Sequence, residues 1–276
     1  SRLLCVAFVN RTVGNAYSIL VGRWYPVAAL GLYTRAAAFP ALPANLLAGI
    51  VQRVSFPLFC RSQDDRPALL ESIRGSGRMV ALIGSAILAW LAALSGELII
   101  FLLGRDWAGA VPLVRILCLS GVLAALVPLH TQMVQATGRS GVFLRLELLK
   151  KAFVIAALAV ACRFGIEAFA WAAVAVSVSD YVVSAWPSAR YLGYSWRRQA
   201  ADILPPVLLS AAAGAAAWLP AWPHLDSALA IMALRSLVMA LVLTLGILAF
   251  RKSLFRDVWS RGLNLSDRLV ALRSFR

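Results

Sequence analysis

Apolar segments long enough to cross a lipid bilayer follow one another along almost the whole chain. Its 276 residues are 61% hydrophobic and 14% charged, and the mean hydropathy is +0.80. A helix needs roughly 20 apolar residues to cross the bilayer core, and its backbone groups must be paired internally. The sequence therefore predicts an all-α, polytopic transmembrane bundle of about eight helices within residues 1–250, and a basic cytoplasmic tail at 251–276. The eight apolar runs are 3–22, 27–60, 78–103, 109–136, 142–162, 166–188, 203–219 and 227–250.

Lysine and arginine collect at alternate ends of these runs. Most of the 27 basic residues lie at Arg2 and within 61–78, 139–151, 190–198 and 251–276. Because positively charged connections stay in the cytoplasm, this distribution places both ends of the chain there. The net charge of +15 is then a topological signal and a source of attraction to an anionic inner leaflet. The dispersed basic residues do not interleave with aromatic ones, so nucleic acid is excluded as a partner.

Motifs for catalysis and metal binding are absent from the sequence. The chain has four cysteines, each alone in an apolar stretch: Cys5, Cys60, Cys118 and Cys162. Their isolation predicts small buried hydrophobes rather than metal ligands. His130 and His224 are the only histidines, and no P-loop, metalloprotease or nucleophile-elbow pattern occurs. We therefore expect no enzyme activity, no cofactor and no metal. The acidic and basic residues of 61–74 are expected to form a solvated loop.

Four arginines lie inside the predicted spans: Arg11, Arg35, Arg53 and Arg235. An unpaired arginine near the bilayer centre costs at least about 2.5–3.5 kcal/mol on insertion scales, so one that persists usually faces a cavity or a partner. Arg11 and Asn15 share one helical stripe with two glycines and a serine, which predicts a polar face at membrane depth. The alternative is that this stripe only packs small residues against a neighbouring helix.

Arg35 and Arg53 lie in the second run, 18 residues apart, which is five full turns of an ideal helix. Both can therefore face one cavity, at a separation of roughly 27 Å. Pro40 and Pro43 remove helical donors between them and favour a bend, as in transporter helices that line a moving cavity. This pattern predicts a bent, water-accessible path for an anion. Snorkelling of the two arginines to opposite interfaces is the alternative.

Two further charged residues sit at depths suited to pairing or to ion coupling. Asp180 lies in the sixth run and Arg235 in the eighth, although the sequence does not show that they meet. Glu147, Lys150 and Lys151 are interpreted instead as a charge cluster at the inner interface.

Short segments in the first half of the chain resemble the Wzx-type polysaccharide flippases of the multidrug/oligosaccharidyl-lipid/polysaccharide exporter superfamily, especially its colanic-acid and teichuronic-acid exporters. The segments are LGLYTRA (30–36), LP (42–43), VSFPLFCRSQDD (54–65), LLGRDWAGAVPLVRIL (102–117), ATGR (136–139) and LELLKK (146–151). The chain opens without methionine, and residues 10–26 resemble the seventh helix of that family. We therefore expect a piece of a longer protein, the C-terminal lobe of a two-lobe flippase.

The resemblance implies a function and a set of partners. Family members flip an undecaprenyl-pyrophosphate-linked oligosaccharide across the inner membrane by alternating access, for exopolysaccharide, O-antigen or capsule synthesis. It implies that Arg35, in the matched YTRA segment, and Arg53, before LFP in the family pattern, bind the substrate, and Asn15 fits the family pattern in the first helix. Arg11 sits one turn before the arginine of that pattern, so its expected part in binding rests on the polar stripe alone. The N-terminal lobe would complete the cleft, and a polysaccharide polymerase and a chain-length regulator are further expected partners.

Three other functions remain open at this level. A drug or cation antiporter of the same superfamily predicts acidic residues in the cavity, for which Asp180 is the candidate. An integral membrane enzyme of envelope glycan assembly predicts large catalytic loops outside the membrane, and the outside connections here are short. A non-transporting scaffold does not need arginines at membrane depth.

Overall fold

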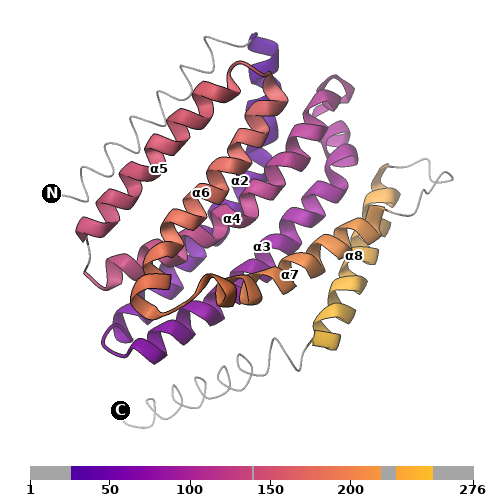
Figure 1. Cartoon of the computed structure of the whole chain (residues 1–276). Coiled ribbons are helices and arrows are strands. Elements are labelled where there is room, and N and C mark those ends of the chain that lie inside the picture. The colour runs from indigo at the N-terminus through magenta and orange to yellow at the C-terminus, as the bar shows by residue number, and fades with distance from the viewer. Residues whose placement is uncertain (1–25, 139, 219–227, 251–276) are drawn as a thin grey trace, which may run out of the picture.

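The computed structural model describes residues 26–138, 140–218 and 228–250, which form helices joined by short connections (Figure 1). The all-α prediction is confirmed. The expected first helix at 3–22 and the tail at 251–276 lie outside the described residues. The elements are α2 (Val27–Arg61), α3 (Arg66–Leu103), the 3₁₀ helix η1 (Arg105–Ala110), α4 (Val111–Ala136), α5 (Ser140–Ala161), α6 (Ile166–Leu192), α7 (Trp196–Trp218) and α8 (Ala228–Phe250).

Most helices match the apolar runs closely, and α3 and α7 are the exceptions: α7 begins at Trp196, before the run at 203. The difference is larger for α3. The helix α3 begins at Arg66, well before the run at 78, so the prediction of a solvated loop is wrong for 66–74 and is confirmed for the short connection at 62–65. The side chain of Asp65 accepts a hydrogen bond from the backbone N–H of Ala68 at 3.2 Å, and Pro67 follows in the first turn. These are the usual signals of a helix start. The helix α2 continues through Pro40 and Pro43 as 35 residues.

Five helical segments in the described part of the chain are long and apolar enough to cross a membrane. They are Arg66–Leu103, Arg105–Ala136, Ile166–Leu192, Trp196–Trp218 and Leu229–Leu248. The chain is thus a multi-pass membrane protein, and α2 runs beside two of these spans, α3 and α4.

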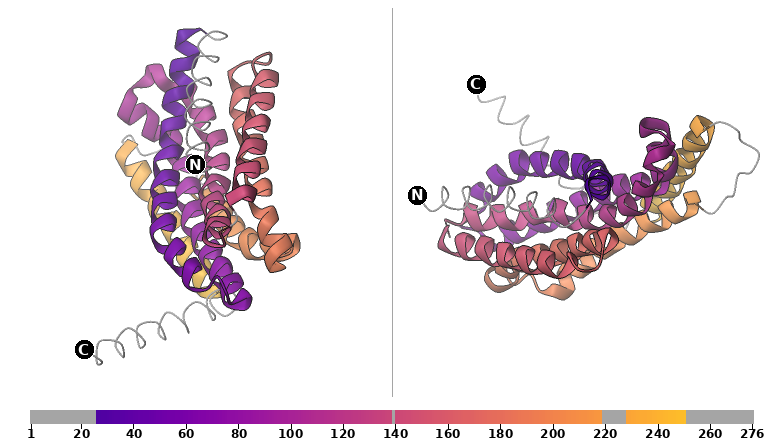
Figure 2. Two further views of the ribbon diagram at one scale, coloured as in Figure 1. Left: turned by 90° about the vertical axis from the view of Figure 1, so that its left-hand side faces the viewer. Right: turned by 90° about the horizontal axis from the view of Figure 1, so that it is seen from above.

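The helix α4 lies at the centre of the bundle, where it packs against α2, α3 and α6. The α5–α6 hairpin forms one flank, and α8 forms the opposite flank beside α7 (Figures 1 and 2). Two apolar clusters hold the central helices together. One includes Val51, Leu69 and Leu129, and the other includes Tyr33 and Leu113. Because each cluster joins α2, α3 and α4, these three helices form the rigid frame on which the site is built.

Gly121 of α4 lies close against α3. A Cβ at this position would lie 3.0 Å from Cδ1 of Leu88. Small residues at such crossings allow membrane helices to pack closely. We expect Gly121→Leu to lower the free energy of unfolding by about 1–3 kcal/mol through overpacking, measured by thermal unfolding in detergent. Gly31→Leu is the matched control because its added Cβ meets nothing within 4 Å, and equal stability of the two variants would contradict the prediction.

Candidate functional site

The helix α2 has one packed side and one exposed side. Its buried residues recur every three or four positions: Tyr33, Ala36, Pro40, Ala44, Leu47, Val51, Ser55 and Phe59. Arg35 and Arg53 each follow a member of this stripe by two positions, which places them about 200° around the helix from it. Both arginines are exposed. The bundle therefore packs against one side of α2 and leaves a side that carries both arginines uncovered by the described helices.

Arg35 and Arg53 form no hydrogen bond or ion pair with another residue that the structure describes. Asn45 and Gln52 are exposed on the same helix, and Gly49 is half-buried. A cationic surface with free guanidinium groups can bind phosphate or carboxylate through paired hydrogen bonds. The expectation that both arginines share one side of the helix agrees with this arrangement. Arg11 and Asn15, which were expected to extend the surface, lie outside the described residues.

The second pair of candidates, Asp180 and Arg235, do not contact each other. Arg235 Nη1 donates to Oε1 of Glu97 at 2.7 Å and to the carbonyl oxygen of Ala93 at 3.3 Å, which ties α8 to α3. The arginine is thus neutralised within the membrane by a carboxylate on a neighbouring helix, as expected for a buried charge. Glu97 is a partner that the sequence alone does not identify.

Asp180 lies against the charged side of α5. The charges that act on it most strongly are those of Lys150, Lys151 and Glu147. Its Oδ1 is buried and has no hydrogen-bond partner among the described residues. Lys150 forms an ion pair with Glu147, and its side chain is only 7% exposed. The ion pair supports the interpretation of these α5 residues as a charge cluster, and Lys150 is buried within it.

Asp202 is a charged centre that the sequence analysis missed. It lies in α7, its side chain is 3% exposed, and two arginines of α3 bind it. Arg74 Nε donates to Oδ2 at 2.7 Å, and Arg78 Nε donates to Oδ1 at 2.8 Å. The Tyr194 hydroxyl donates to Oδ2 at 2.9 Å. Burial and the Asp202 carboxylate raise the pKa of Tyr194, so the phenol remains a donor.

The Asp202 centre continues into a polar network that includes two more helices, α4 and α6. Gln199 donates to the Tyr194 carbonyl oxygen at 2.8 Å and accepts from the Tyr181 hydroxyl at 3.0 Å. The ring of Tyr181 packs edge-on against His130, whose Nδ1 lies 2.8 Å from the Ser188 hydroxyl. This network fixes the starts of α3 and α7 at one end of the bundle, as the charge distribution predicted.

The sequence offered one signal for Asp202. It is a single carboxylate at the start of an apolar run, at the same predicted end of the bundle as Arg74 and Arg78.

Comparison with solved structures identifies the class of fold. The structure superimposes on the lipid II flippase MurJ in an inward closed conformation with a TM-score of 0.72. The match covers 91% of this chain and 52% of that chain, at 15% sequence identity. The chain therefore has the fold of about half of a multi-pass flippase.

Comparison of sequences finds relatives that are named for polysaccharide biosynthesis. Residues 1–112 match the family model described as "Polysaccharide biosynthesis protein". The chain is 28% identical over 215 residues to the teichuronic acid biosynthesis protein TuaB of Bacillus subtilis, which covers 75% of this chain and 43% of that protein. It is 23% identical over 209 residues to the lipopolysaccharide biosynthesis protein WzxC of Escherichia coli, covering 74% of this chain and 42% of WzxC.

A third relative is the succinoglycan biosynthesis transport protein ExoT of Rhizobium meliloti, 23% identical over 68% of this chain and 36% of ExoT. The chain thus spans less than half the length of the curated relatives it matches. These matches confirm the resemblance to polysaccharide flippases that the short segments indicated.

Proposed function

We propose that this chain is one lobe of a flippase that moves an undecaprenyl-pyrophosphate-linked oligosaccharide across the bacterial inner membrane for polysaccharide synthesis. The named relatives support the class of substrate, and the MurJ-like fold supports alternating access. The observation that carries the proposal is the pair of exposed arginines on the side of α2 that the described helices leave uncovered, where neither arginine has an ion-pair partner among the described residues. A second, N-terminal lobe would face this side and enclose the cleft. Transport rather than catalysis is the activity, with both ends of the chain in the cytoplasm.

In the proposed mechanism, Arg35 and Arg53 shield the diphosphate and anionic sugars while the lipid tail remains in the bilayer. Roughly 27 Å separates them along an ideal helix, so they would contact different parts of one long headgroup or act in succession. Arg11 and Asn15 are proposed to extend the same surface. Binding must be moderate, because release requires these contacts to loosen when the lobes move against each other. A polymerase and a chain-length regulator are proposed to act downstream.

Asp180 is proposed as the group that couples transport to an ion. A buried carboxylate oxygen without a hydrogen-bond partner is unusual, and it favours a group that changes its partner or its charge during the cycle. Arg235 is a weaker candidate for coupling because Glu97 already neutralises it.

The substrate proposal is tested by Arg35→Ala and Arg53→Ala in the complete flippase. Each change removes charge-assisted hydrogen bonds worth about 1.5–3 kcal/mol, so we expect glycan export to fall by about tenfold or more. The measurement is surface polysaccharide in cells that lack the native gene, with the flippase quantified in the membrane fraction.

Two further variants make the export experiment specific. Arg145→Ala, which removes an exposed arginine from α5, should leave export unchanged. Lysine at position 35 or 53 should restore part of the activity, because it retains the charge but not the paired donors. Normal export by both alanine variants, with the protein inserted, would contradict the proposed binding surface.

A further inference from the structure

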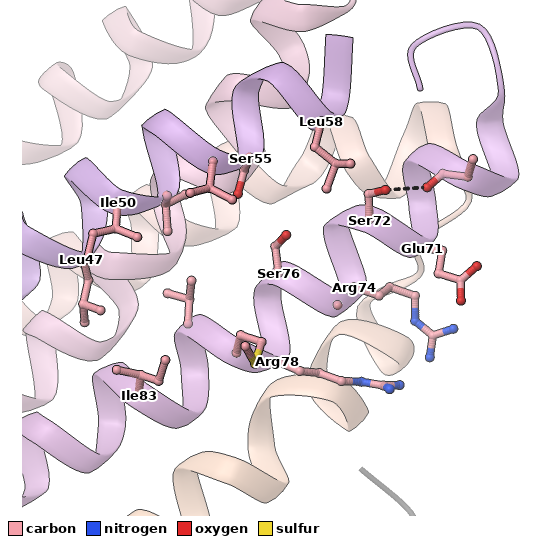
Figure 3. Close-up of a pocket in the computed structure, with 16 residues that line it drawn as sticks. Leu47, Ile50, Ser55, Leu58, Glu71, Ser72, Arg74, Ser76, Arg78 and Ile83 are labelled. Carbon is pink, nitrogen blue, oxygen red and sulfur yellow. Dashed lines mark hydrogen bonds between the residues drawn. The ribbon is translucent and has the colours of Figure 1, made fainter. Parts of the chain in front are cut away.

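A groove of about 660 Å³ runs along the seam between α2 and α3. Its α2 wall is apolar except for Ser55, and the half of its α3 wall beyond Arg78 is also apolar. Figure 3 shows Leu47, Ile50 and Leu58 of α2 directed toward the space that Ser76 of α3 faces from the other side. The heads of Arg74 and Arg78 point away from α2, toward the Asp202 centre. The groove is therefore apolar at one end, and at the other it has serine hydroxyls, arginine stems and the Glu71 side chain.

The groove is open to the surroundings of the bundle. Ile50 is 59% exposed and Val54 is 64% exposed, and Met79 and Ile83 of the opposite wall are exposed as well. An empty apolar groove forfeits dispersion contacts along its whole lining. In a membrane, lipid chains surround the described helices, and one of them can fill this groove.

The dimensions and charge of the groove specify the kind of lipid. Leu47, Ile50, Val54 and Leu58 lie on one stripe of α2, and the next position of that stripe is Arg61, the last residue of the helix. From Leu47 to Leu58 the helix rises about 16 Å, which is close to half of a hydrocarbon core about 30 Å thick. Arg61 is exposed and forms no ion pair with another described residue. A phosphate at the membrane surface would therefore reach Arg61 when its acyl chain filled the apolar part of the groove.

We propose that the α2–α3 groove binds one anionic phospholipid of the leaflet at the Arg61 end, with an acyl chain against Ile50 and Val54 and its phosphate at Arg61. The site is distinct from the arginine surface of α2, because Arg35 and Arg53 do not line it. The bound lipid packs between α2 and α3 and stabilises the angle between the two helices.

The test uses the full chain in phosphatidylcholine nanodiscs that contain a phosphatidylglycerol with a diazirine in its acyl chain. We expect light-induced labelling at Val54, Leu58, Met79 or Ile83, and competition by unlabelled phosphatidylglycerol but not by added phosphatidylcholine. Arg61→Gln should weaken this preference by about fivefold. Arg198→Gln is the matched control, because it removes an exposed arginine at the same end of the bundle but away from the groove.

A second variant tests the groove without removing a charge. Gly75 lines the groove, and a Cβ there meets nothing within 4 Å, so Gly75→Leu should fill the space without straining the helix. We expect it to abolish labelling, whereas Gly31→Leu, outside the groove, should not. Thermal unfolding identifies any variant that is misfolded.

Three outcomes would overturn the proposal. They are labelling that is indifferent to Gly75→Leu, equal competition by both phospholipids, and stronger competition by undecaprenyl phosphate than by phosphatidylglycerol. The last outcome would assign the groove to a polyprenyl chain. Because the assay measures lipid contact and not transport, its result is independent of the proposed flippase activity.

Discussion

Replacing Asp202 with alanine is expected to lower the free energy of unfolding by about 3–5 kcal/mol, among the largest effects of any single change in this chain. The carboxylate is almost fully buried and accepts hydrogen bonds from Arg74, Arg78 and Tyr194. Its removal leaves the charge of Arg78, whose side chain is only 19% exposed, without this partner. Breaking a buried pair from one side is much more damaging than replacing the whole pair with apolar residues.

The measurement for Asp202 is thermal unfolding of the purified chain in detergent. Asp202→Asn keeps the shape and some acceptor capacity but not the charge, so its loss of stability should be intermediate. Asp64→Ala is the matched control, because it removes an exposed carboxylate from the same end of the bundle and should change stability by no more than about 0.5 kcal/mol. If Asp202→Ala unfolds at the same temperature as Asp64→Ala, the centre does not hold α3 and α7 together.

The ends of most helices could be predicted from the sequence because polar residues interrupt the apolar runs there. The apolar run at 27–60 became Val27–Arg61, and the run at 142–162 became Ser140–Ala161. The start of α3 could not be predicted from hydropathy, because its first turns carry the charged residues that bind another helix. The Asp65–Arg66–Pro67 sequence indicates this start instead of hydropathy, because Asp65 caps the helix and a proline follows in the first turn.

The charged pairs between helices were not predictable from one sequence. Arg74 and Asp202 are separated by 128 positions, and Arg235 and Glu97 by 138. Their pairing depends on which helices cross and at what depth, and hydropathy specifies neither. The charge distribution did predict that Arg74 and the start of α7 lie at the same end of the bundle. The position of Arg35 and Arg53 on one side of α2 followed from helical periodicity alone, because their separation is a whole number of turns.

Replacing Lys150 with methionine is the second change expected to have a large effect, again a loss of about 3–5 kcal/mol in the free energy of unfolding. Methionine has a similar length and packs well in an apolar site, so the change tests the charge rather than the volume. It leaves Glu147, whose side chain is 12% exposed, without its ion-pair partner, and it removes one of the positive charges that act on Asp180. Lys151→Met is the control, because Lys151 forms no ion pair with another described residue, and it should be milder.

A double variant separates the pair from the rest of the cluster. Glu147→Leu combined with Lys150→Met removes both charges, and we expect it to recover most of the stability that Lys150→Met loses, as measured by the same unfolding transition. Additive losses in the double variant would mean that Lys150 acts mainly on Asp180 and not on Glu147.

Measuring glycan export distinguishes a role of Asp180 in ion coupling from a role in stability. If Asp180 couples an ion, Asp180→Asn should abolish transport while the lobe stays folded, whereas a purely structural carboxylate would lose export only in proportion to the folded protein that remains.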